Sequence, residues 1–162
     1  MKLWKDVEHL IIKKKMKKLL MILLVTFIGA NSFAQSNSEA KVIHLDDDSF
    51  KEKVFDYEKG GDWKFEGDKP VIVDFYADWC GPCRKIAPVL KELQKEYGDA
   101  IQIYKVDTDD AQKVSAAFGI KSIPSLLFVP MKGKPTMAQG ALPKATFVKA
   151  INDVLGVKAP NW

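Results

Sequence analysis

Cysteine and histidine are scarce in this chain. Its 162 residues include two cysteines, Cys80 and Cys83, and two histidines. A structural zinc site needs four Cys, His or acidic ligands that converge, and two cysteines with two widely spaced histidines do not supply them. The sequence therefore predicts no metal site and no bound cofactor. A purely structural disulfide is the other reading of the cysteine pair, but so short a loop would constrain the unfolded chain little.

An excess of positive charge is also missing once the N-terminal segment is set aside. Residues 1–34 hold seven lysines and two acidic residues, which leaves 18 basic and 19 acidic residues in 35–162. A balanced charge gives no basic surface for nucleic acid, so no nucleic-acid partner is predicted. Internal repeats and low-complexity tracts are absent as well.

No apolar run reaches the roughly 20 residues of an ordinary membrane span. The longest run near the N-terminus covers the 12 residues 19–30, between the basic cluster Lys13–Lys18 and the small-x-small site Ser32–Ala34. This arrangement predicts a signal peptide over 1–34, cleavage near Ala34 and export to the periplasm. The alternative is an uncleaved leader that tethers the protein to the membrane.

The remaining residues, 35–162, are enough for one domain with its own hydrophobic core. Apolar periodicity and capping residues predict strands at 42–45, 70–76, 101–106, 125–129 and 136–139, and helices at about 46–57, 80–97, 109–118 and 145–155. This order predicts an α/β domain with a mixed central β-sheet and helices on both faces.

The two cysteines follow the apolar run Val71–Tyr76 at a strand-to-helix junction. If the helix begins at Cys80, Cys83 lies one turn later on the same face, so the two sulfurs can meet in a reversible disulfide. At the helix N-terminus, unpaired N–H groups and the helix dipole should lower the pKa of the Cys80 thiol and make it the nucleophile. Cys83 is then the resolving thiol. Pro82 suits the first helical turn, and Gly81 permits close approach of a partner chain.

A wider set of residues carries a family resemblance: Val73-Asp74-Phe75, Trp79-Cys80-Gly81-Pro82-Cys83, Pro88, Lys105, Ile123-Pro124 and Gly140-Ala141-Leu142. On these residues, the segment from about Val42 to Leu155 resembles thioredoxin. The resemblance implies a thioredoxin fold and thiol–disulfide exchange through Cys80 and Cys83, without a bound metal, nucleotide or flavin.

Asp74 and Lys105 each interrupt an apolar strand. Exposed or strand-end positions would explain both charges without any function. If both are buried, each costs several kcal/mol unless paired, so we expect them to face each other across neighbouring strands. The resemblance implies that Asp74 transfers a proton to or from Cys83, with Lys105 as its electrostatic partner. A desolvated carboxyl group with a raised pKa suits that role.

Pro124 opens a predicted strand. An ordinary trans bond is the expectation from residue type, since only about 5–6% of X–Pro bonds are cis. The resemblance instead implies a cis bond beside the disulfide, with the backbone of Ile123 binding an extended substrate segment. Trp79 is either part of an apolar rim around Cys80 or an ordinary core residue. The predicted substrate-binding residues are Trp79, Gly81, Pro82, Ile123, Pro124 and Gly140.

Several features depart from the thioredoxin pattern. Tyr76 stands where many thioredoxins have tryptophan, and Arg84 where lysine is common. The segment Asp56–Lys69 makes the first helix-to-strand connection about ten residues longer than usual, which suggests a recognition or dimer feature. Trp63 and Phe65 within it are more simply explained by packing down on the sheet.

The sequence thus predicts an exported thiol–disulfide oxidoreductase that reduces or exchanges disulfides in other polypeptides. Its electrons would come from a membrane donor or a partner thiol protein. One alternative is a net disulfide donor in oxidative folding. Another is a non-catalytic module that binds polypeptides through the surface formed by Trp79, Ile123 and Gly140.

Overall fold

The computed structural model describes residues 41–160. Its strands are β1 (Ile43–Leu45), β2 (Val71–Tyr76), β3 (Gln102–Asp107), β4 (Ser125–Val129) and β5 (Thr136–Gln139). Its helices are α2 (Asp47–Lys53), α3 (Gly81–Tyr97), α4 (Gln112–Ala117) and α5 (Lys144–Asp153), with a short 3₁₀ turn, η2 (Gly98–Ala100). The predicted order of strands and helices is confirmed.

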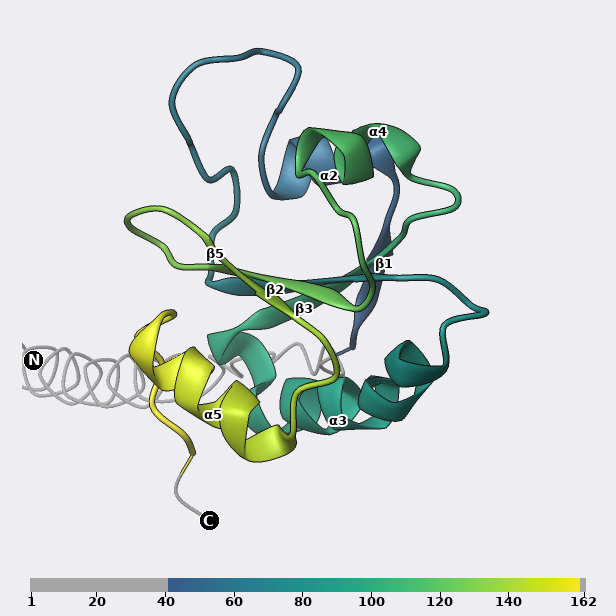
Figure 1. The fold of residues 1–162 in the computed structure, drawn as a ribbon. Helices are drawn as coiled ribbons and strands as arrows, with labels where there is room; N and C mark the ends of the chain where they lie inside the picture. The colour runs from purple at the N-terminus through teal and green to yellow at the C-terminus, as the bar shows by residue number, and fades with distance from the viewer. Residues whose placement is uncertain (1–40, 161–162) are drawn as a thin grey trace, which may run out of the picture. The chain divides into compact units, whose positions relative to one another are not determined.

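The strands form one mixed sheet in the order β1-β3-β2-β4-β5. The strands β1 and β2 both pair parallel to β3, whereas β4 pairs antiparallel to β2 and β5. In Figure 1, α3 and α5 lie on one face of the sheet and α2 and α4 on the other. This is the predicted mixed sheet with helices on both faces.

The central strand β2 is buried along its whole length because helices cover both sides of the sheet. Its side chains alternate between two cores. Ile72 joins the core beneath α3 and α5, with Leu90 and Phe147. Val73 and Phe75 join the core on the α2 and α4 side.

Capping residues place both helices that flank β2. Asp46 and Ser49 form a reciprocal capping box at the start of α2. Cys80 is the N-cap of α3, and Gly98, with a φ of 53°, ends it. A positive φ of this size favours glycine, so the helix ends where the sequence predicted.

Two predicted helices are shorter than expected. The first ends at Lys53 rather than near Tyr57, because the Val54 carbonyl accepts the N–H of Glu66 and is not free to continue the helix. The third begins at Gln112 rather than Asp109, because the Asp107 carboxylate accepts the N–H of Asp109 in a turn.

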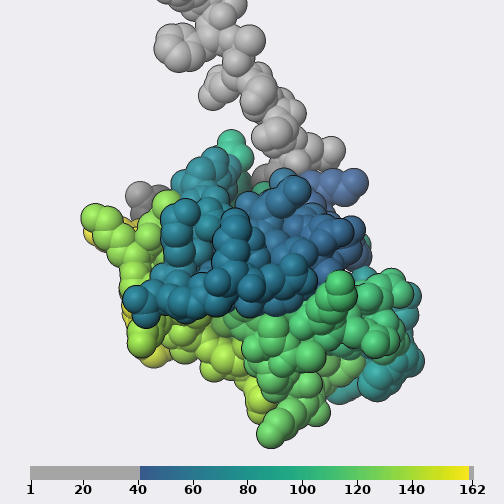
Figure 2. Space-filling model, turned by 90° about the horizontal axis from the view of Figure 1, so that it is seen from above, coloured from purple at the N-terminus to yellow at the C-terminus, as the bar shows by residue number. Residues whose placement is uncertain are grey.

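The connection between α2 and β2 lies over the α2 and α4 face of the domain, beside α4 (Figure 2). Trp63 stacks on Phe55 with ring centroids 4.6 Å apart and meets Phe118 edge-on at 6.3 Å. Phe65 joins the same apolar cluster. Inward packing of Trp63 and Phe65 is therefore confirmed, and Trp63 also stacks on neighbouring aromatic rings.

The predicted signal peptide, 1–34, lies outside the described residues. Between residues 41 and 160, no helix combines the length and apolar character that crossing a membrane requires.

Candidate active site

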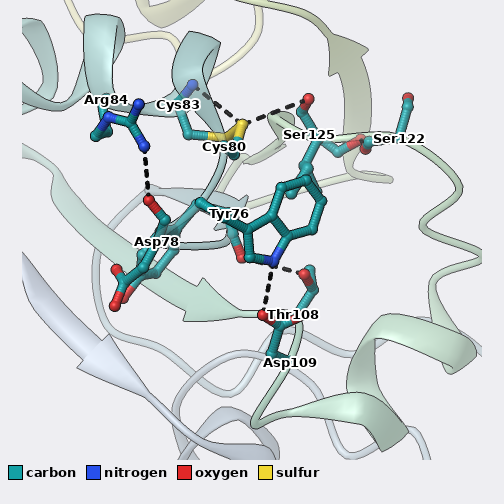
Figure 3. The surroundings of a disulfide bond; sticks show 11 residues. Tyr76, Asp78, Cys80, Cys83, Arg84, Thr108, Asp109, Ser122 and Ser125 are labelled. Atoms are coloured by element: carbon teal, nitrogen blue, oxygen red, sulfur yellow. Dashed lines mark hydrogen bonds between the residues drawn. A yellow bond between two sulfur atoms is a disulfide. The ribbon is translucent and has the colours of Figure 1, made fainter.

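The two cysteines form a disulfide at the start of α3, with their Cα atoms 5.3 Å apart. Both are buried, with exposed fractions of 4% for Cys80 and 3% for Cys83. The backbone N–H of Cys83 donates to the Cys80 sulfur at 3.2 Å (Figure 3). In the reduced protein this N–H and the positive end of the helix dipole favour a thiolate at Cys80. This arrangement suits Cys80 for the predicted role of nucleophile.

Trp79 extends the site outward from the disulfide. Its side chain is 69% exposed, so the interpretation of Trp79 as a core residue is wrong. The indole N–H donates to the Asp109 carboxylate at 2.8 Å, which restrains the ring at the surface. An exposed aromatic ring held in one orientation can contact another polypeptide at little cost in conformational entropy.

The Ile123–Pro124 peptide bond is cis, as the resemblance implied. The Cys80 sulfur lies 3.8 Å from the Ile123 carbonyl oxygen, and Ile123 packs against the buried cluster that contains the two cysteines. The carbonyl of Pro124 accepts the N–H of Gly140 at 2.9 Å. Through these contacts the fold brings three distant parts of the chain to the disulfide.

The remaining predicted contact residues are distributed around this point. Gly140 is exposed at the end of β5 with a φ of 90°. Pro82 is exposed and Gly81 is half-buried in the first turn of α3, whereas Pro124 is buried. The exposed members can meet a substrate directly, and Pro124 can act only through its backbone and its packing.

Asp74 is fully buried on the sheet face that α3 covers. Burial raises the pKa of its carboxyl group to about 7, and the positive charge of Lys105 acts in the opposite direction. Among the described residues, neither carboxylate oxygen has a hydrogen-bond partner. A carboxyl group in this state can hold or release a proton near neutral pH.

Lys105 stands directly opposite Asp74 in the register of β2 and β3. The expectation that the two residues face each other is confirmed, and the alternative that both lie at exposed positions is wrong. Lys105 does not, however, donate a hydrogen bond to Asp74: its ammonium lies 3.4 Å from the centroid of the Tyr76 ring. Burial lowers the pKa of Lys105, and the negative charge of Asp74 partly offsets this.

Comparison with known proteins decides the family. The family model described as Thioredoxin matches residues 41–153. The thioredoxin of Borreliella burgdorferi is 46% identical over 114 residues, which cover 70% of this chain and 97% of that protein. This chain belongs to the thioredoxin family.

Other thioredoxins are similar over the same region. Thioredoxin 1 of a Nostoc species is 40% identical over 105 residues, covering 65% of this chain and 89% of that protein. A protein of Spinacia oleracea described as thioredoxin M-type, chloroplastic, is 39% identical over 120 residues, covering 74% of this chain and 61% of that protein.

The thioredoxin assignment makes the chain a thiol–disulfide oxidoreductase with the thioredoxin fold. Thioredoxins act on disulfide-containing protein substrates, and the Cys80–Cys83 pair fits the Trp-Cys-Gly-Pro-Cys site of the family. Within residues 41–160, no three His, Cys, Asp or Glu side chains are grouped as metal ligands.

Three residues near the thioredoxin site were not recognised as site residues in the sequence. Asp109 holds the Trp79 indole, the Tyr76 ring contacts the Lys105 ammonium, and His44 contacts the Tyr76 hydroxyl. Tyr76 had a detectable signal, because it lies two residues after Asp74 on a strand and therefore points to the same face. His44 and Asp109 had none, since their contacts depend on the pairing of strands.

Proposed function

We propose that this thioredoxin-family protein reduces disulfides in exported proteins. The observation that carries the proposal is the composition of the first turn of α3. A strongly oxidising pair requires extra stabilisation of the reduced thiolate. Neither Gly81 nor Pro82 has a side chain that donates a hydrogen bond or a positive charge to Cys80. Arg84 lies in the next turn, but its guanidinium donates to the Asp78 carbonyl at 2.9 Å and not to Cys80 (Figure 3). The first turn therefore offers no side-chain stabilisation of the kind that a strongly oxidising pair needs.

The reaction has two exchange steps. The Cys80 thiolate attacks one sulfur of a substrate disulfide, the Cys80–substrate bond forms, and the second substrate sulfur leaves as a thiolate that takes up a proton. The Cys83 thiol then loses its proton to the Asp74 carboxylate and attacks the Cys80 sulfur. The Cys80–substrate bond breaks, and the substrate sulfur leaves as a thiolate that takes up a proton. The substrate is now a dithiol, and the protein holds the Cys80–Cys83 disulfide.

Export depends on the leader sequence. Cleavage near Ala34 would release the domain into the periplasm, where electrons must arrive from a membrane donor or a partner thiol protein. Cell fractionation with N-terminal sequencing of the recovered protein tests this. A periplasmic chain beginning at Gln35 is expected. Recovery in the cytoplasm would contradict export, and recovery in the membrane with residues 1–34 intact would identify a tethered form.

The direction of electron flow is tested by the reduction potential of the Cys80–Cys83 pair. Equilibration of the purified protein with a series of glutathione redox buffers gives this value. A potential near about −270 mV, typical of thioredoxin, is expected for a reductase. A potential near about −120 mV would make the protein a disulfide donor and would overturn the proposed direction.

A further inference from the structure

Three polar side chains stand in a row on the sheet face that α3 covers. In the parallel register, His44 of β1 is opposite Lys105 of β3, and Lys105 is opposite Asp74 of β2. Residues opposite each other in neighbouring strands point to the same face of the sheet. Tyr76 follows Asp74 by two residues and shares this face.

Tyr76 reaches from β2 to β1 across this row. Its hydroxyl oxygen lies 3.2 Å from Nδ1 of His44, and the two rings meet edge-on with centroids 5.9 Å apart. Lys105 belongs to the intervening strand, β3, and its ammonium lies against the ring face, 3.4 Å from the centroid. The ring attracts the ammonium through a cation–π interaction. Tyr76 therefore fixes the position of the Lys105 charge.

Tyr76 is itself held from two sides. It is 8% exposed and packs against Cys80 and Cys83. Burial and the charge of Lys105 lower the pKa of His44, so the imidazole is neutral at neutral pH. A neutral imidazole with its proton on Nε2 accepts the tyrosine O–H at Nδ1.

The position of Lys105 matters because Asp74 is left without hydrogen bonds among the described residues. A lysine ammonium that bonded directly to the carboxylate would favour the charged form of Asp74 and hold its pKa low. In the observed arrangement the ammonium acts only through its charge, and burial dominates.

We propose that Tyr76, anchored by His44, is a positioning residue that keeps the Lys105 ammonium out of hydrogen-bonding contact with Asp74 and so keeps Asp74 able to exchange a proton. The use of this proton in catalysis rests on the proposed function. The electrostatic arrangement rests only on the contacts of Tyr76, His44 and Lys105.

Other charges also act on this row. Asp78, Asp107 and Lys91 influence both His44 and Lys105. Lys41, Lys91, His44 and Lys105 contribute to the wall of a cavity of about 600 Å³, where Leu90 and Val42 supply apolar surface. A substitution at Tyr76 leaves these groups in place. Their effects on proton binding by Asp74 therefore cancel to first order when variants are compared.

The test is a double-mutant cycle read by carbon-13 NMR titration of the Asp74 carboxyl group in the oxidised full-length protein. The proteins are the wild type, Tyr76→Leu, Lys105→Met and the double variant. Leucine removes the aromatic face, which frees Lys105 to bond to Asp74. We expect Tyr76→Leu to weaken proton binding by Asp74 about tenfold, and to have no such effect when Lys105 is methionine. Lys105→Met alone should strengthen proton binding.

Two results would overturn the proposal. Unchanged proton binding in Tyr76→Leu would show that the ring does not control Lys105. An equal loss with and without Lys105 would show that the substitution merely admits water to Asp74.

A second pair of variants covers the case in which Tyr76→Leu does not fold. His44→Ala changes an exposed residue of the edge strand β1 and removes only the anchor of the tyrosine hydroxyl. We expect His44→Ala to weaken proton binding by Asp74 less than Tyr76→Leu does, and only when Lys105 is present. Unchanged proton binding would contradict the role of His44 as the anchor. Tyr76→Phe retains the aromatic face and removes the same anchor, so it should match His44→Ala and lose less than Tyr76→Leu. The titration needs no substrate, so it can contradict the positioning role of Tyr76 while the protein remains an active reductase. Equally, the titration can support this role in a protein that proves not to be a reductase.

Discussion

Replacing Asp74 with asparagine should make the stability of this thioredoxin less sensitive to pH. The carboxyl group is fully buried and is raised from a pKa of 3.8 to about 7. An amide has nearly the same shape but does not ionise. The substitution therefore removes one titration from the folded protein and leaves the backbone of β2 in place.

The sign follows from the raised pKa. As the pH rises above 3.8, Asp74 of the unfolded chain loses its proton, while the folded protein holds its proton until about pH 7. The contribution of Asp74 to stability is thus fully present below pH 3.8 and is lost as the pH rises through about 7. The loss amounts to about 4 kcal/mol in the wild type and is absent in Asp74→Asn.

Guanidinium denaturation of both oxidised proteins, followed by circular dichroism from about pH 3 to about pH 9, gives the difference in unfolding free energy at each pH. The variant should gain about 4 kcal/mol relative to the wild type across this range. A buried amide without partners adds a constant cost at every pH, so the change with pH is the decisive quantity.

A control substitution, Asp62→Asn, removes an exposed carboxylate from the connection before β2 and measures what an aspartate-to-asparagine change does at a surface position. A difference for Asp74→Asn that changes by less than about 1 kcal/mol would refute the raised pKa and the proton-transfer role that depends on it.

Three further substitutions test other parts of the protein. Cys83→Ser should stop the reaction at the mixed disulfide through Cys80, visible as a substrate adduct by mass spectrometry; release of reduced substrate at the normal rate would contradict the assignment of the resolving thiol. Trp79→Ala should raise KM for a protein disulfide by about fivefold or more, equivalent to about 1 kcal/mol, while the rate with a small aromatic disulfide stays the same; equal effects on both substrates would point to the chemistry rather than to binding. Phe50→Ala should lower the unfolding free energy by about 3–5 kcal/mol in chemical denaturation, because this ring is fully buried, and a loss below about 1 kcal/mol would contradict its place in the core.

Most of the fold could be predicted because its determinants are local. The apolar run of β2 requires cover on both faces, and the capping residues Asp46 and Cys80 begin α2 and α3. The wrong end of α2 arises where a long-range hydrogen bond competes with helix extension. Glu66 takes the carbonyl of Val54 from twelve residues away, and no helical pattern within α2 reveals this contact.

The candidate active site also combines local features, which the sequence predicts, with long-range contacts, which it does not. The spacing of Cys80 and Cys83 within one helical turn predicts their disulfide, and the geometry agrees. The contact of Trp79 with Asp109 spans 30 residues, and that of Tyr76 with His44 spans 32. Neither could be predicted, since each depends on how separate elements lie side by side.

The order of strands and helices and the pairing of the two cysteines follow from local features of the chain, because the strand period, the caps and the spacing of one helical turn act over a few neighbouring residues. The environment of Asp74 and Lys105 arises only when the chain folds. Pairing of β1, β3 and β2 sets His44, Lys105 and Asp74 in one row, and packing against α3 removes water from the carboxyl group. The strength of an electrostatic interaction depends on distance and burial, and both arise only when these distant segments pack together.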